Sequence, residues 1–433
     1  MLSALRDWNH ARLRRRRAGR GAGEASPATP AGHASSADNL PSPAAEVIDL
    51  AYPALRPLRV YTVPKESVRR VSIVTDSING RSFYGGVGTA LILGALFAEQ
   101  EGARLRVVTR TERPDPQNVG HLFEIYGITP TREVEFAFSH FEDRNRPIDV
   151  QPDERFITTS WWTTVATMGV IPHESIYYLL QEDERMFYPH GDMRLRCERL
   201  MRSRSLRFIV NTRLLRSHLL AEGFDNIAQR GLHFEPAFPS MVYRPRERES
   251  ADDRSLFVFY ARPKDHERNL FHFGLEVIDK AVKRGMLDPQ RWRILFVGKD
   301  VPRLLLGDDR EPEVREGLSW QDYAQLLGQT DVGLFLMYTP HPSYPPLDLA
   351  ASGGIAITNR HGLKQSLDDY SRNIVCAELD IEAMLEALEK ALALSANRAQ
   401  RATNFRESNL QRDWHEALSP VLAWMSAGPS RDV

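Results

Sequence analysis

Short apolar runs alternate with helix-length stretches over most of this chain. The apolar runs are residues 71–75, 105–109, 156–158, 176–180 and 208–211 in the first half, and 256–260, 293–297 and 332–336 in the second. Strands separated by helices run parallel within a sheet, because each helix carries the chain back to the edge where the previous strand began. The pattern therefore predicts two doubly wound α/β units, each with helices on both faces of its sheet.

The two units meet at a Pro- and Arg-rich link near residues 243–255. We expect an N-terminal domain over 56–245, a C-terminal domain over 250–400 and a closing segment over 401–433. A chain of 433 residues that is 42% hydrophobic is long enough for two cores. Within the closing segment we expect a helix over residues 404–418, and Pro420 is expected to kink it or end it.

The first 55 residues differ in composition from the rest. Arginines crowd positions 6–20 against a single acid, Asp7, and residues 18–45 are rich in Ala, Gly, Ser and Pro. Such a segment has little apolar surface to bury, so we expect a disordered arm over 1–55. A solvated tail is the simpler interpretation of its arginines, and peripheral contact with an anionic membrane is the other.

Composition excludes several classes of protein. A net charge of −1 argues against a nucleic-acid binder. Cys197 and Cys376 are far apart and lack His partners at metal spacing, so we expect no metal site, no disulfide framework and a reducing, cytoplasmic compartment. The longest apolar run, 87–98, is shorter than the ~20 residues that span a bilayer. At most, the pattern predicts peripheral contact with the inner face of the plasma membrane.

A glycine-rich loop follows the run at 71–75. Gly85, Gly86 and Gly88 allow backbone N–H groups to turn toward a ligand at a helix N-terminus. A tight turn packed by glycines gives the same pattern. A nicotinamide-dependent oxidoreductase would also use these glycines for its pyrophosphate, although Glu112 and Arg110 fit its ribose contact imperfectly.

Residues 341–358 place Asp348 on a turn that leads into a helix of small residues. Prolines at 342, 345 and 346 disfavour helix before that point, so we expect the helix to begin near Pro346 or Leu347. Its first turn then offers N–H groups and a positive dipole end to an anion, which predicts a phosphorylated ligand. The alternative for Asp348 is an acid that the helix dipole merely stabilises.

Taken together, these segments resemble glycosyltransferase family 4, which has the GT-B fold of two facing Rossmann-like domains with a cleft between them. The resemblance rests on residues 262–269, 296–298, 318–327, 331–334 and 343–348. More narrowly, Gln181 with the acidic run after it, residues 187–189 and residues 341–346 resemble WsaF-type rhamnosyltransferases of bacterial surface polysaccharide synthesis. The likeness runs from about residue 71 to the C-terminus and implies a closing helix that crosses back to the first domain.

This resemblance implies transfer of L-rhamnose or a similar deoxyhexose from a dTDP-sugar, or another nucleotide diphosphate sugar, to a glycan or lipid-linked glycan. Breaking the sugar–phosphate bond leaves negative charge on the diphosphate, which fixed cations stabilise without a metal or other cofactor. The family is usually retaining. The implied donor-binding residues are Gly85, Gly86, Arg262, Lys264, Arg268, Asn269, Gly298, Tyr344 and Asp348.

One departure from the family concerns its first acid, which contacts the transferred hexose. That position falls near Pro340 or His341, where no acid exists. The absence weakly favours a deoxysugar donor, with His341 and Tyr344 taking over the contact. It also keeps open a non-catalytic assembly partner that descends from a glycosyltransferase.

The acceptor is expected beyond the run at 176–180. Gln181, Glu182 and Tyr188 are the candidate acceptor contacts, and Asp183 is the candidate catalytic group, because a carboxylate there can orient or deprotonate a hydroxyl. A solvated acidic cluster is the alternative for this run. Trp161 and Trp162 fit either stacking on sugar rings or packing in the core.

Overall fold

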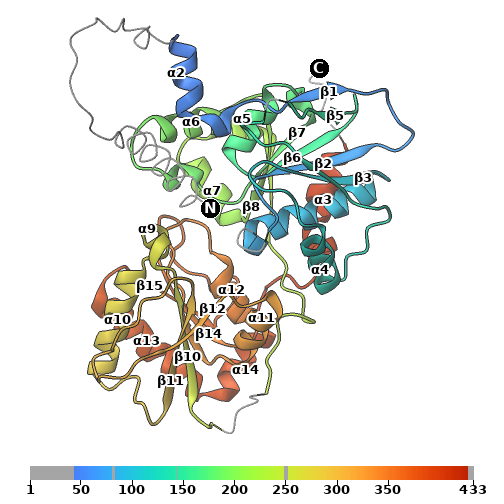
Figure 1. Ribbon diagram of the computed structural model, residues 1–433. Coiled ribbons are helices and arrows are strands. Elements are labelled where there is room, and N and C mark those ends of the chain that lie inside the picture. The colour runs from blue at the N-terminus through green and yellow to red at the C-terminus, as the bar shows by residue number, and fades with distance from the viewer. Residues whose placement is uncertain (1–42, 80–82, 144, 248–251, 428–433) are drawn as a thin grey trace, which may run out of the picture.

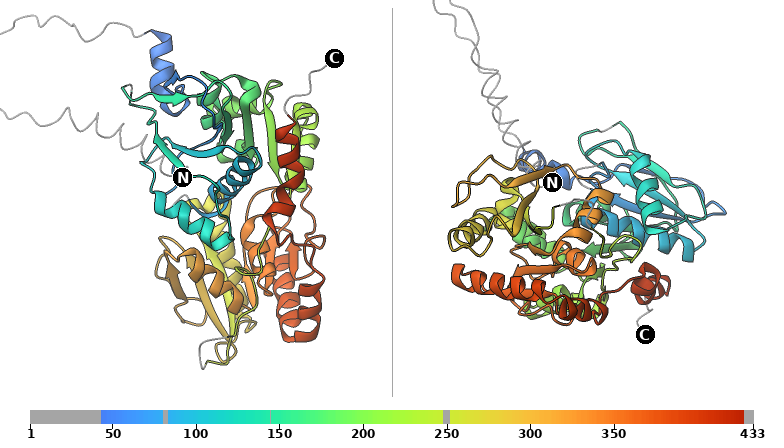
Figure 2. Two further views of the ribbon diagram at one scale, coloured as in Figure 1. Left: turned by 90° about the vertical axis from the view of Figure 1, so that its right-hand side faces the viewer. Right: turned by 90° about the horizontal axis from the view of Figure 1, so that it is seen from below.

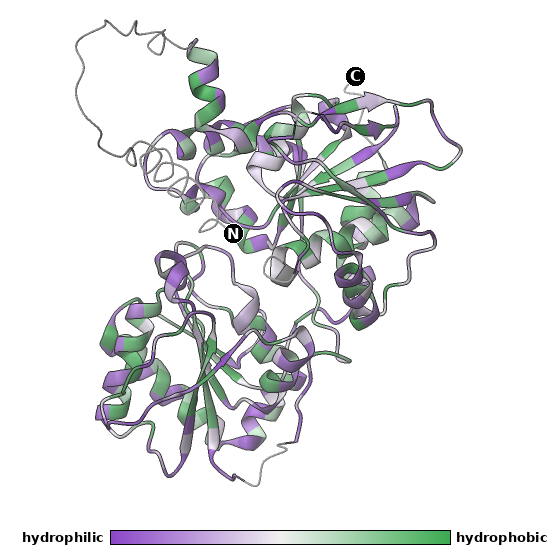
Figure 3. Cartoon of the chain, viewed as in Figure 1, coloured by the Kyte–Doolittle hydropathy of each residue, from purple (hydrophilic) through white to green (hydrophobic). Residues whose placement is uncertain are grey.

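Two parallel sheets divide the chain into two α/β domains that lie end to end (Figure 1). The computed structural model describes residues 43–79, 83–143, 145–247 and 252–427. Apolar residues gather on the strands and on the helix faces that cover them (Figure 3), so each domain has its own core. The predicted doubly wound architecture is confirmed.

The N-terminal sheet has seven parallel strands in the order β4-β3-β2-β6-β7-β8-β9. Its strands are β2 (Arg70–Thr75), β3 (Arg104–Thr109), β4 (Glu135–Phe138), β6 (Arg155–Thr158), β7 (Ile176–Leu180), β8 (Arg207–Asn211) and β9 (Gly231–Phe234). Its helices are α3 (Gly88–Gln100), α4 (Pro116–Tyr126), α5 (Trp161–Met168), α6 (Asp192–Met201), α7 (Arg213–Ala221) and α8 (Asp225–Arg230). A separate parallel pair joins β1 (Val60–Thr62) to β5 (Ile148–Val150).

The C-terminal sheet has six parallel strands in the order β12-β11-β10-β13-β14-β15. Its strands are β10 (Ser255–Ala261), β11 (Trp292–Gly298), β12 (Glu313–Glu316), β13 (Val332–Leu334), β14 (Ile355–Asn359) and β15 (Ile374–Ala377). Its helices are α9 (His266–Asn269), α10 (Phe271–Lys283), α11 (Trp320–Gln329), α12 (Tyr344–Ala351), α13 (Ile381–Ala396) and α14 (Arg398–Arg406).

Strand order reverses once in each sheet. The reversal lies between β2 and β6 in the N-terminal sheet and between β10 and β13 in the C-terminal sheet. Loops that leave neighbouring strands at such a point diverge to opposite faces and open a crevice at the carboxyl ends. The glycine loop before α3 follows β2, Arg262 follows β10, and α12 follows β13.

The last helix, α15 (Trp414–Ser426), returns to the N-terminal domain, where it packs against α3 and β9 (Figure 2). The prediction of a helix over 404–418 that ends at Pro420 was wrong, because α15 starts later and runs through the proline; a kink there stays a prediction. Leu418 and Val421, on either side of the proline, are fully buried in the core that includes α3. This packing offsets the backbone hydrogen bond that Pro420 cannot donate.

Two other local expectations were also wrong. Residues 44–55, placed in the disordered arm, form α2 (Ala44–Ala51) and a short 3₁₀ turn at Pro53–Leu55. Tyr52 donates to Asp192 on α6 at 3.2 Å, and Pro53 is buried, which ties this segment to the domain. Residues 1–42, and with them the arginines proposed to contact a membrane, lie outside the described residues. Among the helices that are described, none has the length and apolarity needed to cross a bilayer.

The third correction concerns α12, which begins at Tyr344 rather than near Pro346. Pro345 and Pro346 therefore occupy its first turn, where an N–H has no intrahelical partner and proline is tolerated. They also remove two of the free N–H groups expected there. The anion site predicted at this helix start consequently has fewer backbone donors than the sequence analysis assumed.

Candidate functional site

The carboxyl ends of both sheets meet at the boundary between the domains, and Tyr344 links them. Its hydroxyl lies 2.6 Å from Thr89 Oγ1 on α3 and accepts a 2.9 Å hydrogen bond from Asn211 Nδ2 at the end of β8. Gly85 and Tyr344 both line a small cavity of about 20 Å³ at this boundary. The structure therefore brings these two predicted donor-side residues together.

The glycine loop contacts the predicted acceptor side directly. Gln181 Nε2 donates a 2.7 Å hydrogen bond to the carbonyl oxygen of Gly86. A Cβ atom at Gly86 would lie 2.9 Å from the same nitrogen, so a larger residue there would displace the Gln181 amide. The Gln181 side chain also accepts a hydrogen bond from Asn211 at 3.4 Å. Gln181 thus joins the loop after β2 to the ends of β7 and β8.

Arg262 leaves β10 at the strand-order reversal of the C-terminal sheet. Its guanidinium donates to the Tyr260 hydroxyl and to Asp265, both at 2.8 Å, and about a third of the side chain is exposed. Lys264 is exposed and pairs with Asp300 at 3.1 Å. Both cations remain accessible at the carboxyl edge of the sheet, which is compatible with their predicted role toward a diphosphate.

Gly298 and Asn269 have local structural explanations. A Cβ atom at Gly298 would lie 1.5 Å from the carbonyl oxygen of Ala261, so glycine is required where β10 and β11 end side by side. Asn269 is buried and donates to the Met337 sulfur at 3.5 Å. Their donor-binding roles stay predictions, since packing alone accounts for both residues.

Arg268 crosses the domain boundary. Its guanidinium lies 2.6 Å from Glu182, which the sequence analysis assigned to the acceptor side, and it stacks over the Phe187 ring at 5.1 Å. Glu182 is only 4% exposed, and its carboxylate also accepts hydrogen bonds from the Thr339 hydroxyl and from the Asp183 N–H. The charge of Arg268, which is predicted to contact the diphosphate, is therefore neutralised by a carboxylate of the opposite domain.

Asp348 lies among tyrosines at the same boundary. It is 3% exposed, and Tyr243 donates a hydrogen bond to its carboxyl group. Within the described part of the chain its Oδ1 atom has no hydrogen-bond partner. Burial raises the pKa of Asp348 to about 8, so the carboxyl is mostly protonated at neutral pH. Asp348 therefore has one unused polar atom, as a ribose contact would require.

The acidic run after β7 is buried, so the alternative of a solvated cluster was wrong. Asp183 forms an ion pair with Arg185 at 2.6 Å and contacts His218 Nε2 at 3.2 Å. Burial opposes its ionisation, but hydrogen bonds from His218 and Arg185 lower the pKa of Asp183 to about 2. Glu184 accepts the backbone N–H of Trp161 at 2.9 Å, and burial raises its pKa to about 8.

Tyr188 and the tryptophan pair belong to the interior of the N-terminal domain. Trp161 and Trp162 are 0% and 5% exposed, which supports the packing interpretation over sugar stacking. The Tyr188 hydroxyl accepts a 2.9 Å hydrogen bond from Trp161 Nε1, and the two rings pack edge to face. The acceptor contact assigned to Tyr188 stays a prediction.

Three residues at the boundary were not assigned from the sequence. Lys364 is 0% exposed and follows β14, His218 lies on α7, and Thr339 precedes α12. No local pattern identifies them, because their partners are distant in the sequence: His218 lies 3.2 Å from Asp183, and Thr339 donates to Glu182. The sequence around Lys364 gives no signal for a buried cation.

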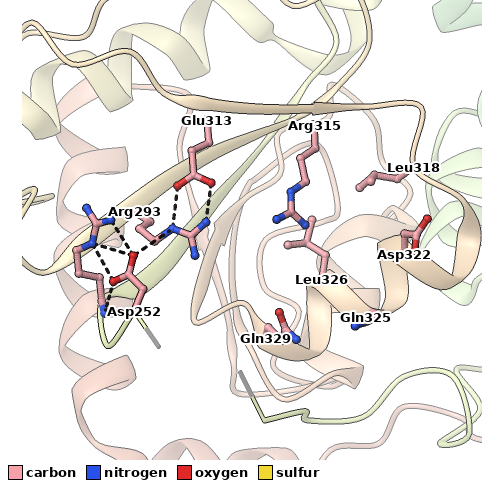
Figure 4. A pocket seen from close by; sticks show the side chains of 10 residues that line it. Asp252, Arg293, Glu313, Arg315, Leu318, Asp322, Gln325, Leu326 and Gln329 are labelled. Atoms are coloured by element: carbon pink, nitrogen blue, oxygen red, sulfur yellow. Dashed lines mark hydrogen bonds and ion pairs between the residues drawn. The ribbon is translucent and has the colours of Figure 1, made fainter. Parts of the chain in front are cut away.

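Another hollow, with a volume of about 620 Å³, lies between β12 and α11 (Figure 4). Its charged side chains are largely satisfied by one another, as Arg293 pairs with Glu313 at 2.6 Å. Asp252 and Arg293 lie at the amino ends of β10 and β11. Ligands of doubly wound sheets bind at the opposite, carboxyl edge, so the domain boundary is the better candidate site.

Comparison with known proteins agrees with this assignment. The sequence profile of the WsaF N-terminal domain matches residues 70–199, and that of the WsaF C-terminal domain matches residues 255–389. The two matches together span more than half of the chain. The chain belongs to the WsaF family of glycosyltransferases. This membership argues against the nicotinamide-dependent oxidoreductase considered from the glycine loop.

A curated relative of this WsaF family member is the O-antigen biosynthesis protein RfbC of Myxococcus xanthus. The two are 29% identical over 257 residues, which are 57% of this chain and 18% of RfbC. The chain therefore spans about a fifth of the length of that relative.

Solved structures similar to this WsaF family member include TarM, HepE of Anabaena in complex with UDP and glucose, and WaaG, a glycosyltransferase involved in lipopolysaccharide biosynthesis. Their TM-scores are 0.59, 0.57 and 0.54, at 8%, 12% and 13% identity. The matches cover 83%, 82% and 83% of this chain and 99%, 99% and 100% of those chains. At such identities the likeness shows the fold alone, and the predicted GT-B fold is confirmed.

Proposed function

We propose that this WsaF family member transfers a hexosyl group from a nucleotide diphosphate sugar to a growing bacterial cell-surface polysaccharide. The observation that carries the proposal is the match of both WsaF domains, in order, over two facing sheets. The similarity to an O-antigen biosynthesis protein and to a solved complex with UDP and glucose supports the acceptor and donor classes. The donor proposed is dTDP-L-rhamnose or another dTDP-deoxyhexose, and the acceptor is a lipid-linked glycan at the inner face of the plasma membrane.

The donor is proposed to bind the C-terminal domain at the carboxyl edge of its sheet. Arg262 and Arg268 contact the diphosphate, and their fixed charges stabilise the anion that forms as the sugar leaves. Asp348 accepts a ribose hydroxyl with its unpartnered oxygen. Transfer of this kind needs no metal, and we propose the retaining outcome typical of glycosyltransferase family 4.

The acceptor is proposed to enter between the end of β7 and the C-terminal domain. A carboxylate with a pKa of about 2 is a weak base, so Asp183 serves better as a positioning residue for His218. His218 faces the other domain, since its Nδ1 atom lies 3.7 Å from the position of a Cβ atom at Gly362. The Asp183–His218 pair thus holds an imidazole at the domain boundary, where an acceptor hydroxyl would approach.

The test is a donor panel with the full chain. Thermal unfolding is followed with dTDP-rhamnose, other nucleotide sugars and free nucleotides, because binding to the folded state raises the transition temperature. Release of nucleoside diphosphate is then measured with a lipid-linked glycan acceptor. Arg262→Ala should lose the shift with dTDP, whereas Arg284→Ala, at an exposed position just after α10, should keep it. The absence of any shift and any turnover in the unmodified chain would refute the proposal.

A second candidate is a non-catalytic assembly partner. The observation that favours it is the lack of an acid at positions 340 and 341, where the family contacts the transferred hexose. Turnover of any nucleotide sugar that depends on Arg262 would exclude this candidate.

A further inference from the structure

A buried cation, Lys364, follows β14 in the C-terminal domain. The residue is 0% exposed, and its Nζ atom is bonded to no side chain or backbone group of the described residues. It sits where backbone hydrogen bonds between His361 and Lys364, at 2.9 and 3.0 Å, close a tight turn after β14. Removing an ammonium from water costs several kcal/mol unless an anion compensates it, so such a group requires a partner.

Lys364 belongs to a cluster of polar and charged side chains that includes Glu182, Arg268, His341 and Cys376. The charges of Arg268 and Lys364 both act on the buried His341 ring, which places the three groups in one cluster. His341 Nδ1 accepts the backbone N–H of Ser343 at 2.8 Å, so a neutral imidazole carries its proton on Nε2. That Nε2–H also lacks a partner among the described residues.

The neutral state of His341 follows from its surroundings. Burial, followed by the charges of Arg268 and Lys364, lowers the pKa of His341 to about 3. A guanidinium, an ammonium and a neutral N–H donor therefore belong to one cluster. Glu182 is the acid that acts on this cluster, through its pair with Arg268 at 2.6 Å and its charge near Lys364.

We propose that Lys364, together with Arg268 and the Nε2–H group of His341, forms an oxyanion-binding site in the cleft. The inference rests on the proposed function, since it assigns Lys364 a contact with the nucleotide sugar. Two sources could supply the oxyanion, namely the phosphate distal to the nucleoside or a carboxylate on the transferred sugar. Both present charged oxygens to the same three donors.

The experiment uses the full chain, its Lys364→Met and Lys364→Gln variants, and Lys390→Met as a control that removes an exposed cation from α13. Calorimetric titrations are made with dTDP, dTMP, UDP, UDP-glucuronate and inorganic pyrophosphate. If the oxyanion is a phosphate, both Lys364 variants should lose about tenfold or more in affinity for dTDP and pyrophosphate, while dTMP binding changes little. If it is a sugar carboxylate, the loss should be confined to UDP-glucuronate.

Thermal unfolding separates this role from a structural one. Methionine matches the length of the lysine stem and carries no charge, so Lys364→Met should unfold at the same or a higher temperature than the unmodified chain. A large loss of stability in both variants would show that the ammonium has a protein partner, and would overturn the proposal. Affinities within twofold of the unmodified chain for every probe would overturn it equally.

Failure of the proposed function gives a different result. An unmodified chain that binds pyrophosphate through Lys364 but neither binds nor turns over any nucleotide sugar would contradict the proposed function and retain the oxyanion site. A chain that keeps its affinity for dTDP, pyrophosphate and UDP-glucuronate and transfers sugar with full activity after Lys364→Met would contradict the oxyanion site alone.

Discussion

Replacing Asp348 by asparagine should stabilise the protein, and the gain should depend on pH. In the folded chain burial raises the pKa of this carboxyl from 3.8 to about 8, with an opposing hydrogen bond from Tyr243. The folded state therefore keeps a proton that the unfolded chain releases above pH 4. Stability contributed at this position is consequently lost as pH rises from about 4 to about 8.

The magnitude follows from the same shift. Each pH unit between the two pKa values costs about 1.4 kcal/mol, so the penalty at pH 7 is about 4 kcal/mol. Asparagine has nearly the same shape and still accepts the Tyr243 hydroxyl, but it does not titrate. The difference in unfolding free energy between Asp348→Asn and the unmodified chain should therefore grow by about 3 kcal/mol from pH 5 to pH 7.5.

The assay is urea denaturation followed by tryptophan fluorescence at several pH values. Trp320 packs in the same cluster as the start of α12 and reports on this part of the C-terminal domain. Asp253→Asn, at an exposed position of the same domain, is the control and should show no growing difference. A difference for Asp348→Asn that stays flat from pH 5 to pH 7.5 would refute the placement of a buried, proton-holding carboxyl beneath the tyrosines.

Three further predictions address the domain boundary. Glu182→Gln removes the carboxylate that pairs with Arg268, so calorimetry should show dTDP binding about three- to tenfold more tightly; unchanged affinity would mean that Arg268 does not contact the diphosphate. Tyr344→Phe removes the hydroxyl that links the domains, so small-angle scattering should report a larger radius of gyration, and an identical profile would contradict a linking role. Asp183→Asn should lower kcat by about a hundredfold and shift the pH–rate profile, with the donor KM little changed, because His218 loses its carboxylate partner; an unaltered profile would count against this pair.

Central strands could be predicted from the sequence, whereas edge strands could not. Strands such as β7 and β8 are buried at every residue, so they appear as continuous apolar runs. The edge strand β12 has the sequence Glu-Val-Arg-Glu and is exposed throughout, which removes any hydrophobic pattern. The prolines of α12 and α15 misled the prediction of helix bounds, because packing on the C-terminal and N-terminal cores outweighs the local cost of proline.

Some residues of the candidate site could also be predicted from the sequence, and others could not. Arg262 and Asp348 follow strands within recognisable segments, so their positions at the carboxyl edge were predictable. The pair of Glu182 with Arg268 joins residues 86 positions apart on different domains, and no local pattern contains it. The pairing was missed for that reason, although each residue had been assigned to the cleft separately.

Burial shifts the pKa values of several groups at the domain boundary away from those in water. Asp348 keeps a proton at neutral pH, His341 is neutral, and Lys364 has a pKa lowered to about 8, chiefly by burial. Apolar residues of similar size would avoid these costs, so stability alone does not account for the presence of an acid, an imidazole and an ammonium here. A ligand that brings hydroxyls to the carboxyl and charged oxygens to the cations would supply the partners that each group lacks. These buried groups would therefore favour a ligand that carries both hydroxyls and charged oxygens, as a nucleotide diphosphate sugar does.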